Sequence, residues 1–404
     1  MLLMQIVFQC SMAILIYVFI VKRRRILLSS SESKKNDDYD ENRRVDNTDG
    51  TSATMMMSPR QMQQRNYTLP ITSYVLGWGF IIPMSFYLPY MMLYHLRILN
   101  GSVRMSTGTT AMIVAYRCIE AMFNTSPHTV EYNQYTYMAY YASLLHFEWN
   151  PNTRQRRSIT MRELIINIGY FVLTWVLLSI LFSYLMYHDF QPFESPIKEM
   201  QNFHFSSDMF HLGHIGNMYL LAILTYLTLS FGLEITGIGE QVKGYYTEPI
   251  FYNPLFSSRS PSDFWSRRWN NMIHTILKYG TFYPAQQFMS KRMALFVTFL
   301  MSGFIHEYSW SLIFYRHPDD KSEPAFVPMY AKLTAFFAWN GIVTLLERPL
   351  APYLQPVTSK IPTLILSTMV VLTVLPVSHW FTGDWVTGNF FRHLAMGLLV
   401  IRKL

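Results

Sequence analysis

Residues 293–315 read MALFVTFLMSGFIHEYSWSLIFY, an apolar run with one histidine and one glutamate past its middle. If a helix begins near Met293, His306 lies thirteen residues along it, or ~20 Å at ~1.5 Å per residue. That depth falls within the ~30 Å hydrocarbon layer of a bilayer. A titratable side chain there needs a partner or a reactant, so His306 is a candidate functional residue. The stretch predicts a helical membrane protein with a polar site inside it.

The composition of the whole chain supports a membrane protein. Of 404 residues, 50% are hydrophobic and 14% are charged, against ~25% charged in ordinary soluble domains. The only cysteines, Cys10 and Cys118, exclude a disulfide framework, and no cysteine–histidine spacing predicts structural zinc. The net charge is +8, but the basic residues lie in loops at the ends of apolar segments, as in membrane proteins. We therefore expect no nucleic-acid partner.

The chain divides into three predicted regions. Residues 1–21 contain no Asp, Glu, Lys or Arg and are followed directly by four basic residues at 22–25, which predicts an uncleaved membrane anchor with a cytosolic C-terminal flank. Residues 22–68 are polar and hold seventeen of the 58 charged residues, which predicts a disordered cytosolic linker. Residues 69–404 are expected to form the membrane domain.

Several further stretches are apolar enough to be predicted spans. With the anchor they total seven, rising to nine if 111–124 and 385–401 also insert; the others are 66–96, 164–188, 209–233, 293–315, 327–346 and 361–383. In 66–96, Pro83 and Pro89 are expected to kink or break the helix. The predicted fold class is therefore an all-α polytopic membrane protein with about seven to nine transmembrane helices. No internal repeat is visible, which removes the usual sequence signal of a transporter with symmetric halves.

Charged residues inside these segments have structural as well as functional interpretations. Arg117 and Glu120 are three residues apart, a spacing that favours an internal ion pair over a site. Glu234 and Glu347 lie near segment ends, where solvation or a local Arg348 explains them at least as well as catalysis.

Three polar residues, Asp208, His211 and His214, raise the question of a metal. A His-x-x-His pair on one helix turn can bind a metal ion. A di-iron oxidase, however, resembles a set of clustered histidine boxes, and no two of the twelve histidines here are adjacent. We favour a hydrogen-bonding or substrate-lining role and expect no metal site.

Small residues surround His306 on its predicted helix. Ser302, Gly303 and Ser309 lie at positions i−4, i−3 and i+3, so there is room beside the imidazole. This pattern fits the approach of another molecule and, equally, close packing of a second helix. Glu307 points about 100° away from His306 and is expected to be structural.

The segment SPSDFWSRRWNNMIHTILKYG at 260–280 opens with a helix-start signal: Ser260 as N-cap, Pro261 at the first helical position and Asp263 three residues after the cap. A helix over 261–279 follows, with apolar residues on one side and polar residues opposite. The apolar side carries Trp265, Trp269, Met272, Ile273 and Ile276, the polar side Arg267, Asn271, His274 and Lys278, and the borders Asn270 and Arg268. The pattern predicts an interfacial amphipathic helix.

These two segments together resemble a known family. FWSRRWN at 264–270, followed by SGFIHEY at 302–308, is similar to the paired motifs of the membrane-bound O-acyltransferases, and closest to the wax synthase branch, which joins long-chain alcohols to fatty acyl groups. The motifs cover about 45 residues, and the multi-span layout extends the match loosely over the rest of the membrane domain. Arg267 and Arg268 replace the Asp and Trp of the FYxDWWN form found in the sterol and diacylglycerol branch.

The resemblance implies an activity and a site. It implies esterification of a long-chain alcohol by fatty acyl-CoA, a co-substrate rather than a cofactor, in the endoplasmic reticulum membrane. The family's catalytic histidine falls on His306 and its motif asparagine on Asn270. The residues expected to bind substrate are Trp265, Arg267, Arg268, Trp269, Lys278, Ser302, Gly303 and Ser309. For the three basic residues, contact with the phosphates of coenzyme A and contact with lipid headgroups are both open.

Other functions stay open at this point. Diacylglycerol and sterol are alternative acceptors for the same acyl transfer. A polypeptide is a further possible acceptor. A transporter or a di-iron lipid oxidase would use the buried polar groups differently. The sequence leaves homo-oligomerisation undetermined.

Overall fold

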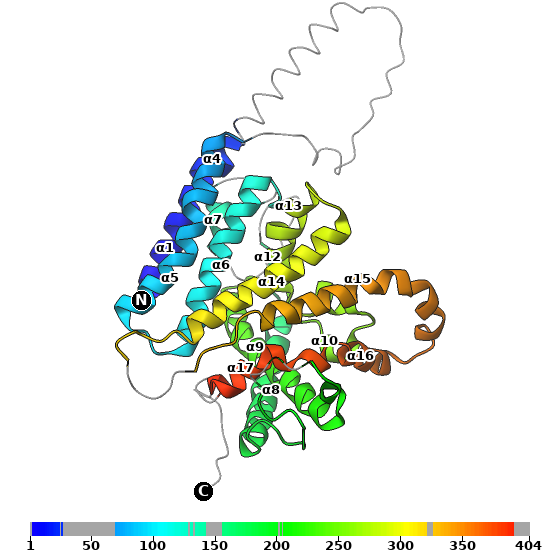
Figure 1. The fold of residues 1–404 in the computed structure, drawn as a ribbon. Helices are drawn as coiled ribbons and strands as arrows, with labels where there is room; N and C mark the ends of the chain where they lie inside the picture. The colour runs from blue at the N-terminus through cyan, green and yellow to red at the C-terminus, as the bar shows by residue number, and fades with distance from the viewer. Residues whose placement is uncertain are drawn as a thin grey trace, which may run out of the picture.

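The computed structural model describes residues 2–24, 26, 69–127, 130–131, 134–142, 156–200, 203, 205–320 and 326–391 (Figure 1). This part of the chain is helical, as predicted, and its one β contact is an isolated bridge between Ser158 and Tyr245. Most of the predicted linker, residues 27–68, lies outside the described residues. So do residues 392–404, which include 392–401 of the predicted span 385–401.

The N-terminal helices form one side of the molecule (Figure 1). They are α1 Leu2–Ile16 with a π-helical turn η1 Tyr17–Val21, α4 Ile71–Leu76, η2 Gly77–Ile81, α5 Ile82–Leu96, α6 Gly101–Phe123 and α7 Gln134–Ala142. Helix α6 packs against α1 and α5. The predicted ion pair is confirmed, because Arg117 Nη1 lies 2.8 Å from Glu120 Oε1, and both side chains are buried. The predicted anchor is thus packed against the rest of the fold, and its helix continues through Arg24.

Helix α5 departs from the prediction of a break near the two prolines. Residues 71–96 run as one continuous helical span through α4, η2 and α5. The π-helical turn η2 ends at Ile81, directly before Ile82, so Pro83 follows this locally wider turn within the continuous helix. Pro89 is accommodated inside the helix.

Two long helices, α8 Met161–Tyr187 and α9 Leu212–Val242, lie side by side after the N-terminal group. Helix α8 begins with a capping box in which Thr160 and Glu163 satisfy each other's backbone N–H groups. A short 3₁₀ turn, η3 Ser207–Phe210, precedes α9, and the Nδ1 of His211 accepts the N–H of Gly213 as its N-cap. His211 therefore caps a helix.

The C-terminal helices surround the segment quoted first. They are α14 Lys291–Ile313, α15 Lys332–Thr358, α16 Thr363–Leu372, η6 Leu375–Val377 and α17 His379–Thr387. Helices α14 and α15 pack along each other across the middle of the molecule (Figure 1). Glu307 accepts the backbone N–H of Thr334 at 3.1 Å, in the first turn of α15. As expected, Glu307 is structural: its carboxylate caps α15.

The segment 261–279 is not the continuous helix that the sequence predicts. It forms α11 Pro261–Asp263, a π-helical turn η4 Phe264–Arg268, α12 Asn271–Leu277 and a second π-helical turn η5 Lys278–Phe282; α10 Pro254–Ser257 precedes it and α13 Tyr283–Gln286 follows. The helix breaks at Trp269, which is extended, and at Asn270, which is left-handed with φ 45°. Asn tolerates this conformation better than other non-glycine residues. The break rotates α12 relative to η4.

The predicted count of seven to nine spans is not confirmed among the described residues. Three helical segments there are long and apolar enough to cross a bilayer: Ile71–Leu96, Met161–Tyr187 and Leu212–Val242. A fourth span results if Thr363–Val377 and His379–Thr387, bent by 60°, are counted as one. Helices α14 and α15 fall short because polar groups such as His306 and Glu347 interrupt their apolar sequence.

Candidate active site

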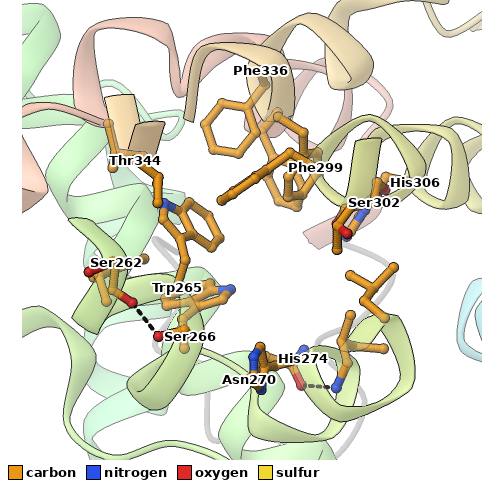
Figure 2. A pocket seen from close by; sticks show the side chains of 18 of the residues that line it. Ser262, Trp265, Ser266, Asn270, His274, Phe299, Ser302, His306, Phe336 and Thr344 are labelled. Atoms are coloured by element: carbon orange, nitrogen blue, oxygen red, sulfur yellow. Dashed lines mark hydrogen bonds between the residues drawn. The ribbon is translucent and has the colours of Figure 1, made fainter. Parts of the chain in front are cut away.

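A cavity of about 570 Å³ lies where α9, η4, α12, α14, α15 and the α16–α17 turn meet (Figure 2). Its walls are mainly apolar, with a few polar side chains directed inward, as in small-molecule sites, which usually measure roughly 300–1,000 Å³. Asn270 and His274 lie at one edge in Figure 2, and Ser302 and His306 at the facing edge. The two motifs recognised in the sequence therefore meet across one cavity.

His306 enters the cavity from α14. Its Nδ1 lies 2.7 Å from the carbonyl oxygen of Ser302, one turn earlier. A carbonyl only accepts, so Nδ1 carries the proton and Nε2 is left as an unprotonated acceptor. The ring stacks on Phe337 at 4.6 Å and contacts Phe381 at 5.3 Å between centroids. These aromatic contacts and the backbone bond hold the imidazole in one orientation and one tautomer.

Asn270 faces His306 from the break before α12. Its side-chain Oδ1 accepts the N–H of Ile273 at 3.2 Å, which makes Asn270 the N-cap of α12. With Oδ1 used in the cap, the amide orientation is fixed and Nδ2 remains as a donor at the cavity edge. One residue thus both starts the helix and supplies a donor to the site.

The wall beside Asn270 is held by aromatic contacts and one carboxylate. Trp265 on η4 contacts Phe299 of α14 and Phe337 of α15, each at 6.0 Å between centroids. Glu347 of α15 accepts the backbone N–H of Ser262 at 2.7 Å and its hydroxyl at 2.8 Å. These contacts tie the FWSRRWN segment to the two helices that carry and cover His306. The sequence singled out Glu347 without assigning it this partner.

Residues 248–342, which contain both motifs and α14, match the family model described as membrane bound O-acyl transferase family. The resemblance to the membrane-bound O-acyltransferases is confirmed. The match covers the part of the chain that builds the facing edges of the cavity.

Relatives of this acyltransferase-like chain carry related names. Probable long-chain-alcohol O-fatty-acyltransferase 2 of Arabidopsis thaliana is 28% identical over 34% of this chain and 39% of its own length. Long-chain-alcohol O-fatty-acyltransferase of Simmondsia chinensis is 28% identical over 32% of this chain and 37% of its own length. Acyl-CoA–sterol O-acyltransferase 1 of Arabidopsis thaliana is 31% identical over 32% of this chain and 36% of its own length. The chain spans about half or less of the length of such relatives.

The small residues near His306 divide between cavity and packing. Ser302 lines the cavity. Gly303 faces α15 instead, and a Cβ on it would lie 2.5 Å from the Cα of Thr334. Ser309 is buried against Gly108 and Met112 of α6, and its hydroxyl donates to the carbonyl oxygen of Ile305 on its own helix at 2.9 Å. Gly303 and Ser309 are therefore corrected from substrate contacts to helix-packing residues, because α15 covers Gly303 and α6 covers Ser309.

Of the three basic residues predicted to bind substrate, two line the cavity and one does not. Arg267 and Lys278 line the cavity together with both tryptophans, Trp265 and Trp269, although a continuous helix would place those charges on the opposite side. Arg268 does not line it: its Nε lies 2.7 Å from Asp263, and its Nη1 donates to Tyr252 O at 3.0 Å. Arg268 is therefore absent from the cavity wall and instead lines the polar surface hollow beside it.

A polar surface hollow adjoins the cavity on the side of Arg267. It shares Ser262, Ser266 and Arg267 with the cavity; Arg259 and Arg268 are further basic residues in it, and the carboxylate of Asp263 also lines it. Hydroxyl groups and guanidinium groups dominate its lining. The sequence analysis did not identify this hollow.

His274 is a cavity residue that the sequence analysis assigned only to a polar helix face. It lies four residues after Asn270 and lines the same cavity (Figure 2). Burial and, to a smaller extent, the nearby Lys278 charge together lower the pKa of His274 from 6.5 to about 4. His274 is therefore neutral near pH 7. The four-residue spacing from Asn270 was the available signal for it.

The histidines discussed as metal candidates have other contacts in the structure. Buried His214 contacts the ring of His379 at 5.0 Å between centroids. Within the described ranges, no group of three or more His, Cys, Asp or Glu residues is arranged to hold a metal ion.

Proposed function

We propose that this protein is an acyl-CoA-dependent O-acyltransferase that esterifies a long-chain alcohol to a wax ester. The observation that carries the proposal is the meeting of His306 and Asn270 across one largely apolar cavity. A base and an amide donor facing each other are what attack of an alcohol on a thioester needs. The names of the relatives supply the substrate class.

His306 acts as the general base. An alcohol is ionised far above pH 7, so its oxygen needs a base within hydrogen-bond reach as it attacks the thioester carbon. The bond from Nδ1 to Ser302 O leaves Nε2 to accept that proton. The same bond stabilises the imidazolium that results, because the carbonyl oxygen remains its acceptor.

Asn270 stabilises the negative charge that develops on the acyl carbonyl oxygen. Its Nδ2 is available because Oδ1 is occupied by the helix cap. Removal of a comparable oxyanion-hole donor in other enzymes costs ~3–4 kcal/mol of transition-state stabilisation. Neither Cys10 nor Cys118 lines the cavity, so we propose direct transfer from thioester to alcohol rather than an acyl-enzyme.

The polar hollow receives the head of acyl-CoA. Coenzyme A carries several phosphate charges, and arginine pairs with phosphate through two parallel N–H donors. Arg259 and Arg267 supply these donors, and the hydroxyls of Ser262 and Ser266 line the way from hollow to cavity. Residence in the endoplasmic reticulum membrane, where the apolar product stays in lipid, belongs to the same proposal.

A sterol is the second candidate acceptor, because one relative is an acyl-CoA–sterol O-acyltransferase. The two are separated by expression in a yeast strain lacking its own neutral-lipid acyltransferases, fed fatty alcohol or sterol. We expect wax ester in the lipid extract of cells fed fatty alcohol, and none from cells expressing His306→Ala at equal protein level. Steryl ester alone would favour the sterol, and turnover by His306→Ala would overturn the proposed mechanism.

A further inference from the structure

The cavity lining carries positive charge, and the roles given above to its residues leave part of that charge without an anionic partner. Its lining includes two permanent cations, Arg267 and Lys278, and no Asp or Glu among the described residues. Arg267 also borders the polar hollow, where phosphate can neutralise it. Lys278 lines the cavity but not the hollow, so an anion that pairs with it would have to lie inside the cavity.

Lys278 has no carboxylate within ion-pair distance in the described part of the chain. Its Nζ lies 5.7 Å from the ring centroids of both Tyr279 and Tyr283, which face the ammonium with the negative side of their π systems. Aromatic rings support a cation without neutralising it. Lys278 therefore presents a positive charge that no carboxylate neutralises to a largely apolar cavity, where its interaction with an anion is screened less than at the open surface.

His274 stands between Lys278 and Asn270. Lys278 continues the helical conformation of α12, so it lies one turn after His274, about 6 Å further along the axis. Among the described residues, no protein group hydrogen-bonds the imidazole of His274. A neutral imidazole has one N–H, which is therefore available to an occupant of the cavity.

The four substituents of the reacting carbon indicate which substrate atom lies nearest to Lys278 and His274. In the tetrahedral intermediate the carbon holds the acyl chain, the attacking oxygen, the former carbonyl oxygen and sulfur. The attacking oxygen lies toward His306 and the carbonyl oxygen toward Asn270, which face each other across the cavity (Figure 2). We assign the side of His274, which lies one turn from Asn270 and lines the same cavity, to the sulfur bonded to the same carbon.

We propose that Lys278 and His274 are further catalytic residues that stabilise the coenzyme A thiolate as it leaves. The inference rests on the proposed acyl transfer. In that step the alcohol proton passes to Nε2 of His306, the C–O bond forms, and the carbonyl electrons move to oxygen. When they return, the C–S bond breaks and its electron pair stays on sulfur. The Lys278 charge and the His274 N–H stabilise that thiolate until the His306 imidazolium returns the proton, giving free thiol and ester.

The test compares three acyl donors with purified protein. Acyl-CoA carries phosphates, the acyl thioester of N-acetylcysteamine has a similar thiol but no phosphate, and the acyl p-nitrophenyl ester has a leaving group that needs little stabilisation. We expect Lys278→Met to lower kcat at least tenfold with both thioesters and much less with the p-nitrophenyl ester. KM for acyl-CoA should change little. Lys278→Arg should recover most of the wild-type kcat. His274→Leu should also lose more kcat with the two thioesters than with the p-nitrophenyl ester, but the loss should be smaller than in Lys278→Met.

Lys291→Met, which removes an exposed lysine at the start of α14, is the matched control and should behave as wild type. A loss confined to acyl-CoA and to KM would overturn the inference in favour of phosphate binding. An equal loss with all three donors would overturn it in favour of a structural role. If Lys278→Met does not purify as a folded species, His274→Leu carries the same comparison. Failure of the wild type to form ester would overturn the proposed function as well, whereas an unaffected Lys278→Met beside an inactive His306→Ala overturns this inference alone.

Discussion

Asn270 performs two tasks with two ends of one amide. Oδ1 caps α12, and Nδ2 is the donor at the cavity edge. An aspartate at this position keeps the cap, since its carboxylate accepts the N–H of Ile273 and Asp also tolerates the left-handed backbone. It cannot donate at neutral pH. The two functions of Asn270 are therefore separable by substitution.

We predict that Asn270→Asp lowers kcat by a factor of about 10²–10³ while leaving the thermal midpoint near that of wild type. Asn270→Ala loses the cap as well and should also be less stable, by about 1 kcal/mol or more. Turnover and thermal unfolding in detergent check both. If Asn270→Asp were as active as wild type, the amide nitrogen would have no role in the transition state.

His274 makes a separate prediction about pH and stability. Its pKa is about 4 in the folded protein against about 6.5 when exposed, so between these values the unfolded chain binds more protons. This contribution is absent above pH 6.5 and destabilises the fold progressively as the pH falls toward 4, by up to about 3 kcal/mol. His274→Gln should therefore lose less thermal stability than wild type between pH 7 and pH 4.5. Equal losses in the two proteins would show that His274 is not buried as described.

Among the elements, the link from Glu347 to Ser262 fixes the position of the motif segment. Two hydrogen bonds join α15 to the first turn of α11, just before the turn that carries Trp265 and Arg267. Because α15 also packs along α14, the link indirectly positions the base relative to the donor. Small displacements of reacting groups have large kinetic effects.

Glu347→Ala is expected to reduce kcat about tenfold or more without abolishing folding, since it releases one end of the wall that bears Asn270. Glu347→Gln keeps an acceptor for Ser262 and should recover a substantial part of that loss. Arg348→Ala, an exposed neighbour, serves as the control. Single-turnover rates with saturating donor are the measurement. Equal activity of Glu347→Ala and wild type would remove the positioning role.

The long helices were the most predictable elements. The expected spans 164–188 and 293–315 lie within three residues of α8 and α14, because apolar length and cap residues are local properties. The segment 261–279 was harder. Asp263 and Arg268 are five residues apart, which on an α-helix separates them, whereas the π-helical turn η4 brings them together. That turn and the left-handed Asn270 depend on tertiary contacts that no helical pattern contains.

The site shows the same limit. A helical wheel correctly marked the face of α14 around His306 as small, but it does not say which neighbour covers that face. Ser302 turned out to line the cavity, whereas Gly303 meets α15. His274 was visible as a residue four positions after Asn270, yet only the cavity itself brings it to the reacting groups.

At the scale of the whole molecule, the N-terminal helix is bound into the fold by a buried cation. Arg24 is 3% exposed, forms an ion pair with Glu131, and donates to the carbonyl oxygen of Ala121 at 2.6 Å. Ala121 belongs to α6, which packs in turn against α14. The predicted anchor therefore supports the helix behind the candidate site instead of serving only as a membrane tether.

Arg24→Met should lower the free energy of unfolding by about 3–5 kcal/mol, because it withdraws a guanidinium from a buried carboxylate. The adjacent Arg23 is exposed, with a hydrogen bond of 3.4 Å to Thr72, and Arg23→Met should change stability by less than about 1 kcal/mol. In the double variant Arg24→Met with Glu131→Gln, the charge to be compensated is gone, so part of the lost stability should return. Denaturation midpoints of wild type, Arg24→Met, Glu131→Gln and the double variant in one detergent give the coupling, with Arg23→Met measured beside them. Equal effects of Arg23→Met and Arg24→Met would mean that the first helix contributes to the fold only through its apolar contacts.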